Sequence, residues 1–307
     1  MRLALCEIMS ILVVGSVALD TIKTPHSRCE EVLGGSATFF SFSARLFGQV
    51  NLVAVVGRDF PARYLKLFKE KGIDIAGLEA ADGETFRWEG EYEWDFNSAK
   101  TIATHLNVFS DFNPKIPAQY RHSKYVFLAN IDPEIQERVL KQVIRPKLVA
   151  CDTMNHWIES KKKQLTRFLK KVDILFLNDG EARQLSGENN LLRAAKAIFK
   201  FGPKRIIIKK GEHGAMLFSK NSVFCVPAFL LEEVYDPTGA GDTFAGGVMG
   251  YLANQKNLND DVLRRAIVHG NIMATFAVED FGPWRLVSLT KPEVEKRLKE
   301  FKQLTCF

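Results

Sequence analysis

Residues 236–250 read DPTGAGDTFAGGVMG, a glycine-rich turn that runs directly into a stretch with helical periodicity. Gly239 and Gly241 can adopt positive φ angles and present successive backbone N–H groups. The N-terminus of the helix that follows adds partial positive charge. The sequence therefore predicts an anion-binding turn at Gly239, Ala240 and Gly241.

Asp242 falls in the first turn of this helix, beside the predicted anion site. An aspartate there can accept the proton of an attacking hydroxyl while backbone amides hold a phosphoryl group. The structural alternative is that Asp242 caps the helix and the glycines only make a tight turn. Because a helix N-terminus favours the charged form, we expect the pKa of Asp242 to be low and its carboxylate to be a weak base.

The segment resembles the C-terminal signature DTxGAGD of the ribokinase-like (PfkB) carbohydrate kinases, with Pro237 at a tolerated position. The resemblance implies an α/β fold, a three-layer sandwich with a central, mostly parallel sheet and a small β-sheet lid. It also implies ATP-dependent phosphorylation of a hydroxymethyl group, with Asp242 facing the attacking hydroxyl. We expect one kinase domain over residues 1–307, with lid segments at about 20–32 and 84–109.

The composition is that of a globular protein large enough to bury a core, with 46% hydrophobic and 25% charged residues. The net charge of +6 is spread along the chain, which favours solvated helix faces over a nucleic-acid track. Five cysteines show no C-x-x-C pairing, so we expect a reducing, cytoplasmic compartment and no cysteine metal site.

No apolar run approaches the roughly 18 residues of a membrane helix, so no membrane partner is expected. Residues 1–10 faintly imitate a signal peptide, but Glu7 interrupts the apolar run. We expect a short extension, within which Met9 is an alternative start.

A buried strand over residues 10–16 runs into GSVALD, which places Asp20 beyond the carboxyl end of that strand. In the family that the chain resembles, the aspartate of this GxxxxD pattern binds substrate hydroxyls. Gly34-Gly35 precede a largely buried helix and resemble the family's N-terminal GG signature. Turn formation is the alternative for all three residues.

Polar residues also follow two further predicted strands, at 125–129 and 147–151. Carboxyl ends of parallel strands face the ligand site of an open α/β sheet. Asn130, Asp152 and Asn155 are therefore expected to contact substrate or phosphate, with turn formation as the alternative.

The acceptor is less well defined, because many relatives carry asparagine where this chain has Phe39. We expect a sugar first. A nucleoside is the alternative, since aromatic rings would stack on a base, namely those of Phe39, Phe40, Phe42, Trp88, Tyr92 and Trp94. Core packing, or a homodimer through the lid, would explain the same residues. A non-catalytic ligand-binding relative is a third class, and a dehydrogenase is disfavoured by the missing GxGxxG fingerprint.

A strand predicted at 173–178 ends in NDGE, which fits the family's N-x-x-E motif. The resemblance assigns Asn178 to the ATP site and Glu181 to the Mg²⁺ that binds with ATP, through its water shell. Mg²⁺ keeps most of its waters and prefers oxygen ligands, which agrees with this assignment. Alternatively, Glu181 only opens the next helix.

Resemblance also supplies the remaining ligand assignments. Lys209 and Gly211, in a K-x-G turn, are expected beneath the nucleotide, and Asn271 near the adenine. In cation-dependent relatives, residues equivalent to Asp236 and Thr238 join the loop here at 279–284 to hold K⁺, so K⁺ activation is a candidate property of this chain.

Overall fold

The computed structural model describes residues 10–96 and 99–306. Residues 97–98, inside the predicted lid segment at 84–109, and residues 1–9 of the N-terminal extension lie outside the described residues. Within them, the chain forms a nine-stranded central sheet. Its strands are β1 (Ile11–Val14), β4 (Val50–Val56), β5 (Ile73–Ala80), β8 (Tyr125–Leu128), β9 (Leu148–Cys151), β10 (Ile174–Asn178), β11 (Arg205–Lys209), β12 (Ala215–Phe218) and β13 (Val223–Val226).

The central sheet has the order β13-β12-β11-β10-β9-β8-β1-β4-β5. It is parallel from β11 to β5, and β12 and β13 add antiparallel pairs at one edge. Strands buried on both faces are near-continuous apolar runs, as ILVV of β1 illustrates. That pattern is why the sequence predicted β1, β8, β9 and β10 correctly.

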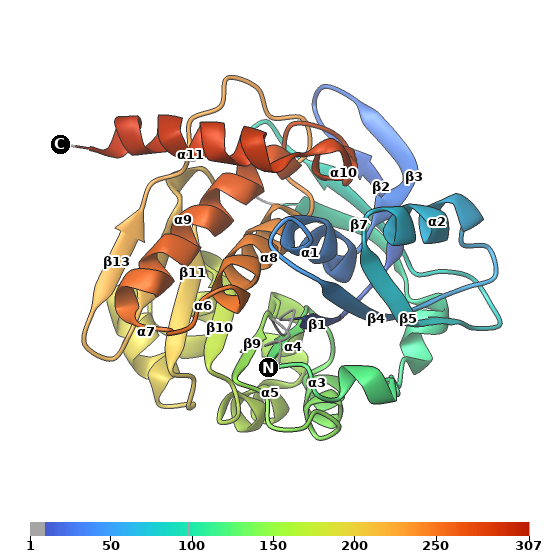
Figure 1. Ribbon diagram of the computed structural model, residues 1–307, viewed down its shortest axis with the longest axis horizontal. Coiled ribbons are helices and arrows are strands. Elements are labelled where there is room, and N and C mark those ends of the chain that lie inside the picture. Colours follow the sequence, from blue (N-terminus) through green and yellow to red (C-terminus); the bar gives the residue numbers. More distant parts are fainter. Residues whose placement is uncertain (1–9, 97–98, 307) are drawn as a thin grey trace, which may run out of the picture.

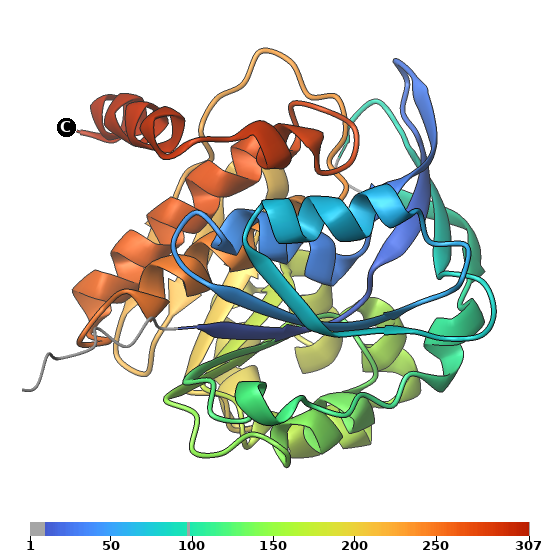
Figure 2. The same ribbon diagram turned by 45° about the vertical axis from the view of Figure 1, so that its right-hand side comes forward.

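Helices cover both faces of the sheet, which makes the three layers of the predicted sandwich (Figures 1 and 2). One layer contains α1 (Ser36–Ala44), α2 (Ala62–Glu70), α8 (Ala240–Ala253), α9 (Asp260–Ala277), α10 (Trp284–Ser288) and α11 (Lys291–Thr305). The other contains α3 (Pro133–Leu140), α4 (Asn155–Ser160), α5 (Lys162–Leu169), α6 (Asp179–Ser186) and α7 (Leu191–Phe199). The predicted fold class is confirmed.

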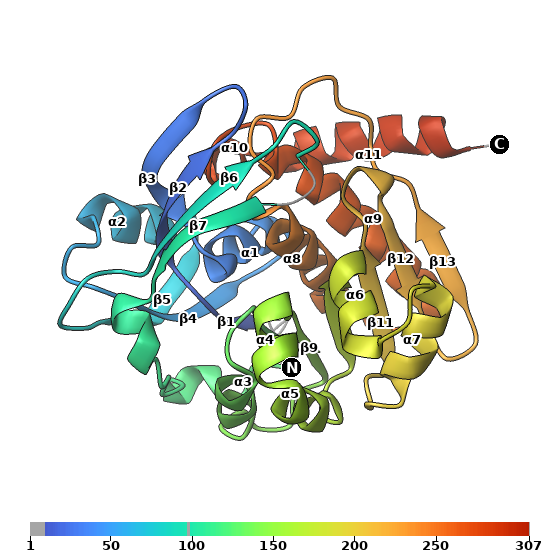
Figure 3. The same cartoon turned by 180° about the vertical axis from the view of Figure 1, so that it is seen from behind.

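A second, small sheet stands apart from the central one (Figure 3). Its strands are β2 (Ala18–Lys23), β3 (Arg28–Gly34), β6 (Arg87–Tyr92) and β7 (Ala99–His105), in the order β3-β2-β6-β7. They come from the two chain segments in which the sequence predicted lid strands. We call these four strands the small sheet.

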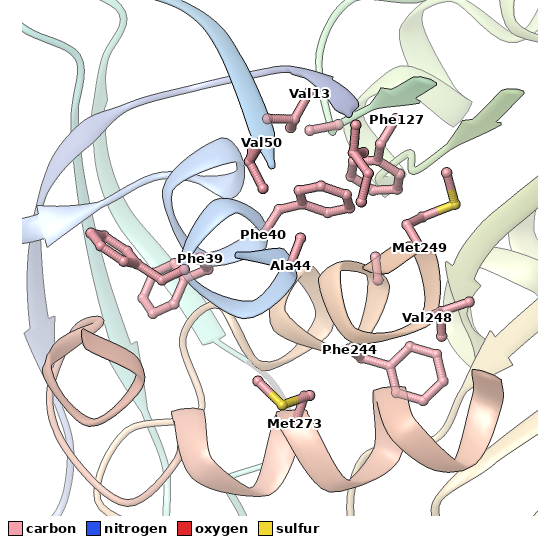
Figure 4. Packing of buried hydrophobic residues seen from close by; sticks show 14 of the residues in the cluster. Val13, Phe39, Phe40, Ala44, Val50, Phe127, Phe244, Val248, Met249 and Met273 are labelled. Atoms are coloured by element: carbon pink, nitrogen blue, oxygen red, sulfur yellow. The ribbon is translucent and has the colours of Figure 1, made fainter. Parts of the chain in front are cut away.

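Small residues bring α8 close to both of its helical neighbours. A β-carbon added to Gly246 would lie 2.5 Å from the carbonyl oxygen of Phe40 on α1, and one on Gly247 would lie 2.9 Å from Gly270 Cα on α9. Figure 4 shows Phe40 pointing from α1 toward Phe127, with which it stacks at a centroid distance of 4.2 Å. This packing fixes α8, and therefore the turn at its N-terminus, against the central sheet.

Candidate active site

The N-terminus of α8 has the geometry of an anion site. Gly239 is the N-cap residue, with φ 74°, and its carbonyl oxygen accepts the first helical hydrogen bond, from Thr243 N at 2.8 Å. Over the described part of the chain, the backbone N–H groups of Gly241 and Asp242 have no protein acceptor. Two unpaired donors at a helix N-terminus are suited to a phosphoryl group.

Asp242 is half-buried beside these amides, and its carboxylate has no hydrogen-bond partner among the residues described. Burial, and next the charge of Asp152, raise the pKa of Asp242 to about 8, although Lys209 opposes the shift. The low pKa expected from the helix N-terminus is therefore wrong, because loss of water and nearby carboxylates outweigh the helix. A raised pKa makes Asp242 a stronger base than we expected.

Asp20, Gly34 and Gly35 lie together at the junction of β2, β3 and α1. Asp20 is 4% exposed and Oδ2 accepts a hydrogen bond from Gly35 N at 3.3 Å. A β-carbon on Gly34 would lie 1.8 Å from the same oxygen, so only glycine fits beside this carboxylate. Burial raises the pKa of Asp20 to about 7. These three of the residues that the sequence assigned to the acceptor thus form one group.

Asn130 follows β8 as predicted, but its side chain is held by the region of α4. Trp157 Nε1 donates to Asn130 Oδ1 at 3.1 Å, and Asn130 Nδ2 donates to Met154 Sδ at 3.1 Å. These bonds give Asn130 a structural role. Its contact with the acceptor stays a prediction.

Asn178 and Glu181 form a reciprocal capping box at the start of α6. Glu181 N donates to Asn178 Oδ1 at 2.8 Å, and Asn178 N donates to Glu181 Oε2 at 2.7 Å. Burial, and then Asp152, raise the pKa of Glu181 to about 7. No group of three metal-ligating side chains occurs among the described residues. A Mg²⁺ site here would therefore depend on water and phosphate oxygens, which Mg²⁺ readily uses.

Besides Asn178, resemblance assigns three residues to the nucleotide, and the side chains of two of them have defined partners. Lys209 Nζ lies 2.7 Å from Asp152 Oδ2. Asn271 is 5% exposed on α9, and its Nδ2 donates to the carbonyl oxygen of Pro227, after β13, at 3.0 Å. Asn271 is therefore a buried, hydrogen-bonded residue and not an exposed helical asparagine. Gly211 lies on the surface with φ 54°, where glycine is favoured.

Asp236 joins the turn before α8 to the loop at 279–284. Its side chain is fully buried, Oδ1 accepts from Thr238 N at 2.8 Å and Oδ2 accepts from Gly282 N at 3.0 Å. Burial raises the pKa of Asp236 to about 6. The structure thus brings together the segments that resemblance assigns to K⁺.

The sequence named Tyr92 only as one of the aromatic rings that would stack on a base, and its contact with the anion-binding turn was not predicted. Thr238 Oγ1 donates a hydrogen bond to the Tyr92 hydroxyl at 3.2 Å, which links β6 of the small sheet to the anion-binding turn. Burial raises the pKa of Tyr92, and the charges of Asp236, Asp20 and Asp242 add to the shift. The only signal in the sequence was the alternation of aromatic and polar residues along this strand.

The aromatic residues of α1 are core residues. Phe39 is 1% exposed and Phe40 and Phe42 are fully buried. Their rings are unavailable to stack on a base. Core packing therefore explains these three of the six aromatic residues that favoured a nucleoside.

The class of protein that fits this fold and site is a small-molecule kinase. The fold is a parallel α/β sandwich with a small sheet, and the site combines the free amides of a helix N-terminus with an adjacent carboxylate. The chain belongs to the pfkB family of carbohydrate kinases, whose model matches residues 8–283. It is a phosphotransferase that acts on a sugar or a nucleoside. No helix in the described part of the chain is long and apolar enough to cross a membrane.

Relatives within the family include both nucleoside and polyol kinases. Cytidine kinase of Thermococcus kodakarensis is 30% identical over 260 residues, which cover 83% of this chain and 92% of that protein. Inositol 3-kinase of Arabidopsis thaliana is 24% identical over 302 residues, covering 94% and 81%. The crystal structure of Methanocaldococcus jannaschii nucleoside kinase matches with a TM-score of 0.76 and 23% identity, covering 95% of this chain and 99% of that one.

Proposed function

We propose that the chain is a nucleoside kinase that transfers the γ-phosphoryl group of ATP to the hydroxymethyl group of the ribose. The observation that carries this proposal is the pairing of Asp20 with Trp88, which are direct neighbours in register on β2 and β6. Neighbouring register partners project from the same face of a sheet. A buried carboxylate suited to ribose hydroxyls therefore shares its face of the small sheet with an indole suited to the base. The ring lies over Gly90, and its Nε1 donates to Thr101 Oγ1 at 3.3 Å.

Similarity to cytidine kinase and to archaeal nucleoside kinases supports the same acceptor class. A free sugar, which we placed first from the sequence, is the second candidate. The buried rings of Phe39, Phe40 and Phe42 favour it, because they remove one reason to expect a base. Both acceptors present a hydroxymethyl group and ring hydroxyls to Asp20.

In the proposed reaction, Asp242 accepts the proton of the attacking hydroxyl and the amides of Gly241 and Asp242 hold the γ-phosphoryl oxygens. Asp20 orients the acceptor through its hydroxyls. Mg²⁺ bound with ATP would neutralise phosphate charge, with Asn178 and Glu181 contacting its water shell. Lys209, Gly211 and Asn271 are placed along the nucleotide.

Three further expectations belong with this proposal. Asp236 and Thr238, with the loop at 279–284, would hold K⁺. A homodimer through the small sheet and a cytoplasmic location also stay predictions. Trp94, 77% exposed, is an aromatic surface residue that such a dimer would cover.

The test is incubation of the protein with Mg-ATP and a panel of nucleosides and free sugars, with ADP release and product mass as readouts. We expect a nucleoside monophosphate from at least one nucleoside. A phosphorylated free sugar without any nucleotide product would favour the second candidate. Acceptor binding without ADP release would overturn the kinase assignment and indicate a non-catalytic relative.

A further inference from the structure

Lys209 and Asp152 form an ion pair at the carboxyl ends of β11 and β9, on either side of β10. The distance from Nζ to Oδ2 is 2.7 Å, and the side chains are 17% and 5% exposed. Two charged groups so far from water require good geometry to be tolerated, because desolvation is costly. Their position at the end of the sheet that faces ligands suggests a role beyond stability.

The backbone holds the Asp152 carboxylate in place. Oδ1 accepts a hydrogen bond from Thr153 N at 2.8 Å, which leaves Oδ2 for Lys209. Gln136 Nε2 in turn donates to the carbonyl oxygens of Asp152, at 3.0 Å, and of Ala129, at 2.9 Å. The carboxylate is therefore a rigid support for the lysine ammonium.

The ammonium lies against the anion-binding turn. A β-carbon added to Gly241 would be 2.9 Å from Lys209 Nζ. An ammonium has three donors, and within the described chain Asp152 is the only hydrogen-bond acceptor of Nζ. Two donors thus remain beside the free amides of Gly241 and Asp242.

Lys209 keeps its proton in this position. Burial lowers its pKa, but the charges of Asp152, Glu181 and Asp242 raise it, and the pKa lies above its ordinary value. A charged ammonium beside amide donors is suited to a phosphate oxygen.

We propose that Lys209 contacts the γ-phosphoryl group during transfer and that Asp152 is the positioning residue that aims its ammonium. This inference rests on the proposed kinase function. The bond from phosphorus to the β-phosphate oxygen breaks, the bond to the acceptor oxygen forms and the acceptor proton passes to Asp242. Lys209 remains protonated and donates hydrogen bonds to oxygens on which charge is distributed.

The chain offers a matched ion pair at the opposite ends of β10 and β11. Lys204 Nζ lies 2.7 Å from Asp173 Oδ1, and Asp173 Oδ2 accepts from Val149 N at 2.8 Å. This pair repeats the Lys209–Asp152 arrangement away from the carboxyl ends of the strands. Lys204 is 71% exposed where Lys209 is 17% exposed, so this pair is a control for losing the contact outside the site and not for losing a buried charge.

The experiment compares Lys209→Met with Lys204→Met by calorimetric binding of Mg-ADP and of the β,γ-imido analogue of ATP, and by turnover. For Lys209→Met we expect at least about tenfold weaker binding of the ATP analogue, ADP binding within about twofold, and turnover lower by about 10²–10³, as for removal of one transition-state donor. Lys204→Met should change none of these. The proposal would be overturned if Lys209→Met weakened the binding of ADP and of the ATP analogue equally, or weakened the binding of neither.

Two further variants test the positioning role. Lys209→Arg should recover part of the preference for the ATP analogue over ADP that Lys209→Met loses, because arginine keeps the positive charge. Asp152→Asn should reduce that preference, whereas Asp173→Asn should not, and thermal unfolding shows whether each variant is folded. If Lys209→Met does not fold, Asp152→Asn decides: an unchanged preference in that variant contradicts the inference. Absence of ADP release with every acceptor would contradict the proposed function, while the binding comparison would still test Lys209.

Discussion

The ring of Phe39 lies directly against Gly239, so that a β-carbon added to Gly239 would meet Phe39 Cγ at 2.2 Å. Phe39 is the residue at which the chain departs from the polar pattern of many relatives. Its ring supports the anion-binding turn from within α1. The departure therefore concerns how the turn is held, and it is not by itself a sign of a different acceptor.

Replacement of Gly239 by alanine should impair catalysis through this contact. The added methyl group would clash with Phe39 and would have to adopt φ 74°, which is strained for alanine. We expect turnover to fall by at least about 10², the cost of losing one transition-state donor. Gly72→Ala is the control, since Gly72 also has φ 74° but an added β-carbon there meets open space. Similar turnover in the two variants would show that the Phe39 contact does not matter.

Asp242→Asn should keep ATP binding and reduce turnover by about 10²–10⁴, the range for a positioned acid–base group. Steady-state kinetics and nucleotide titration measure the two effects. Near-normal turnover in this variant would remove Asp242 from the role of base.

The same substitution should stabilise the ligand-free protein at alkaline pH. The pKa of Asp242 is about 8 in the folded protein, against an ordinary value of 3.8. Between these two pH values the folded state therefore binds more protons at this site than the unfolded state does. Its stability contribution is full below pH 3.8 and is lost as the pH rises through about 8. The amide that replaces the carboxyl group cannot lose a proton, so we expect a Tm at least about 2–4 °C higher than wild type at pH 8.5, with little difference at pH 4. An unchanged Tm difference across this range would contradict the raised pKa.

The pH profile of kcat/KM should have an acid limb near neutrality. This parameter reports the free enzyme, in which Asp242 titrates near pH 8 and Asp20 and Glu181 near pH 7. Because Asp152 and Lys209 also face Asp242, the apparent values belong to the cluster. We expect activity to fall by about tenfold per pH unit below pH 7. A flat profile between pH 5 and pH 8 would be inconsistent with a carboxylate base in this environment.

Glu181→Gln should move the Mg²⁺ activation curve to higher metal concentration. Glutamine can still close the capping box with Asn178, so the start of α6 should persist while the charge is lost. Turnover measured against free Mg²⁺ at fixed ATP gives the midpoint. An unchanged midpoint would mean that Glu181 only caps the helix.

Continuous apolar runs and glycine-hinged turns made the inner strands, α8 and α9 predictable from the sequence. Asn259 caps α9, accepting from Val262 N at 3.0 Å. The edge strand β5 was missed because its half-exposed residues lack a clean period, and the hairpin of β12 and β13 at the other edge was missed as well.

Site residues were predictable where a local motif contains them, as at Asp20 and Asp242. Contacts between distant segments were not. Nothing in the sequence indicates that Tyr92 receives a hydrogen bond from Thr238, or that Asp152 pairs with Lys209 across β10. The pKa of Asp242 was predicted in the wrong direction for the same reason, since the carboxylates that raise it come from other strands and helices.

The central claim is that this chain phosphorylates a nucleoside with Asp242 as base. The most direct measurement is competition between nucleosides and free sugars at fixed Mg-ATP, compared by kcat/KM. We predict that a nucleoside such as cytidine is preferred over ribose by about a hundredfold or more, which corresponds to about 2.7 kcal/mol of transition-state discrimination. A preference of that size for a free sugar would contradict the account, and would show that Trp88 beside Asp20 does not receive a base.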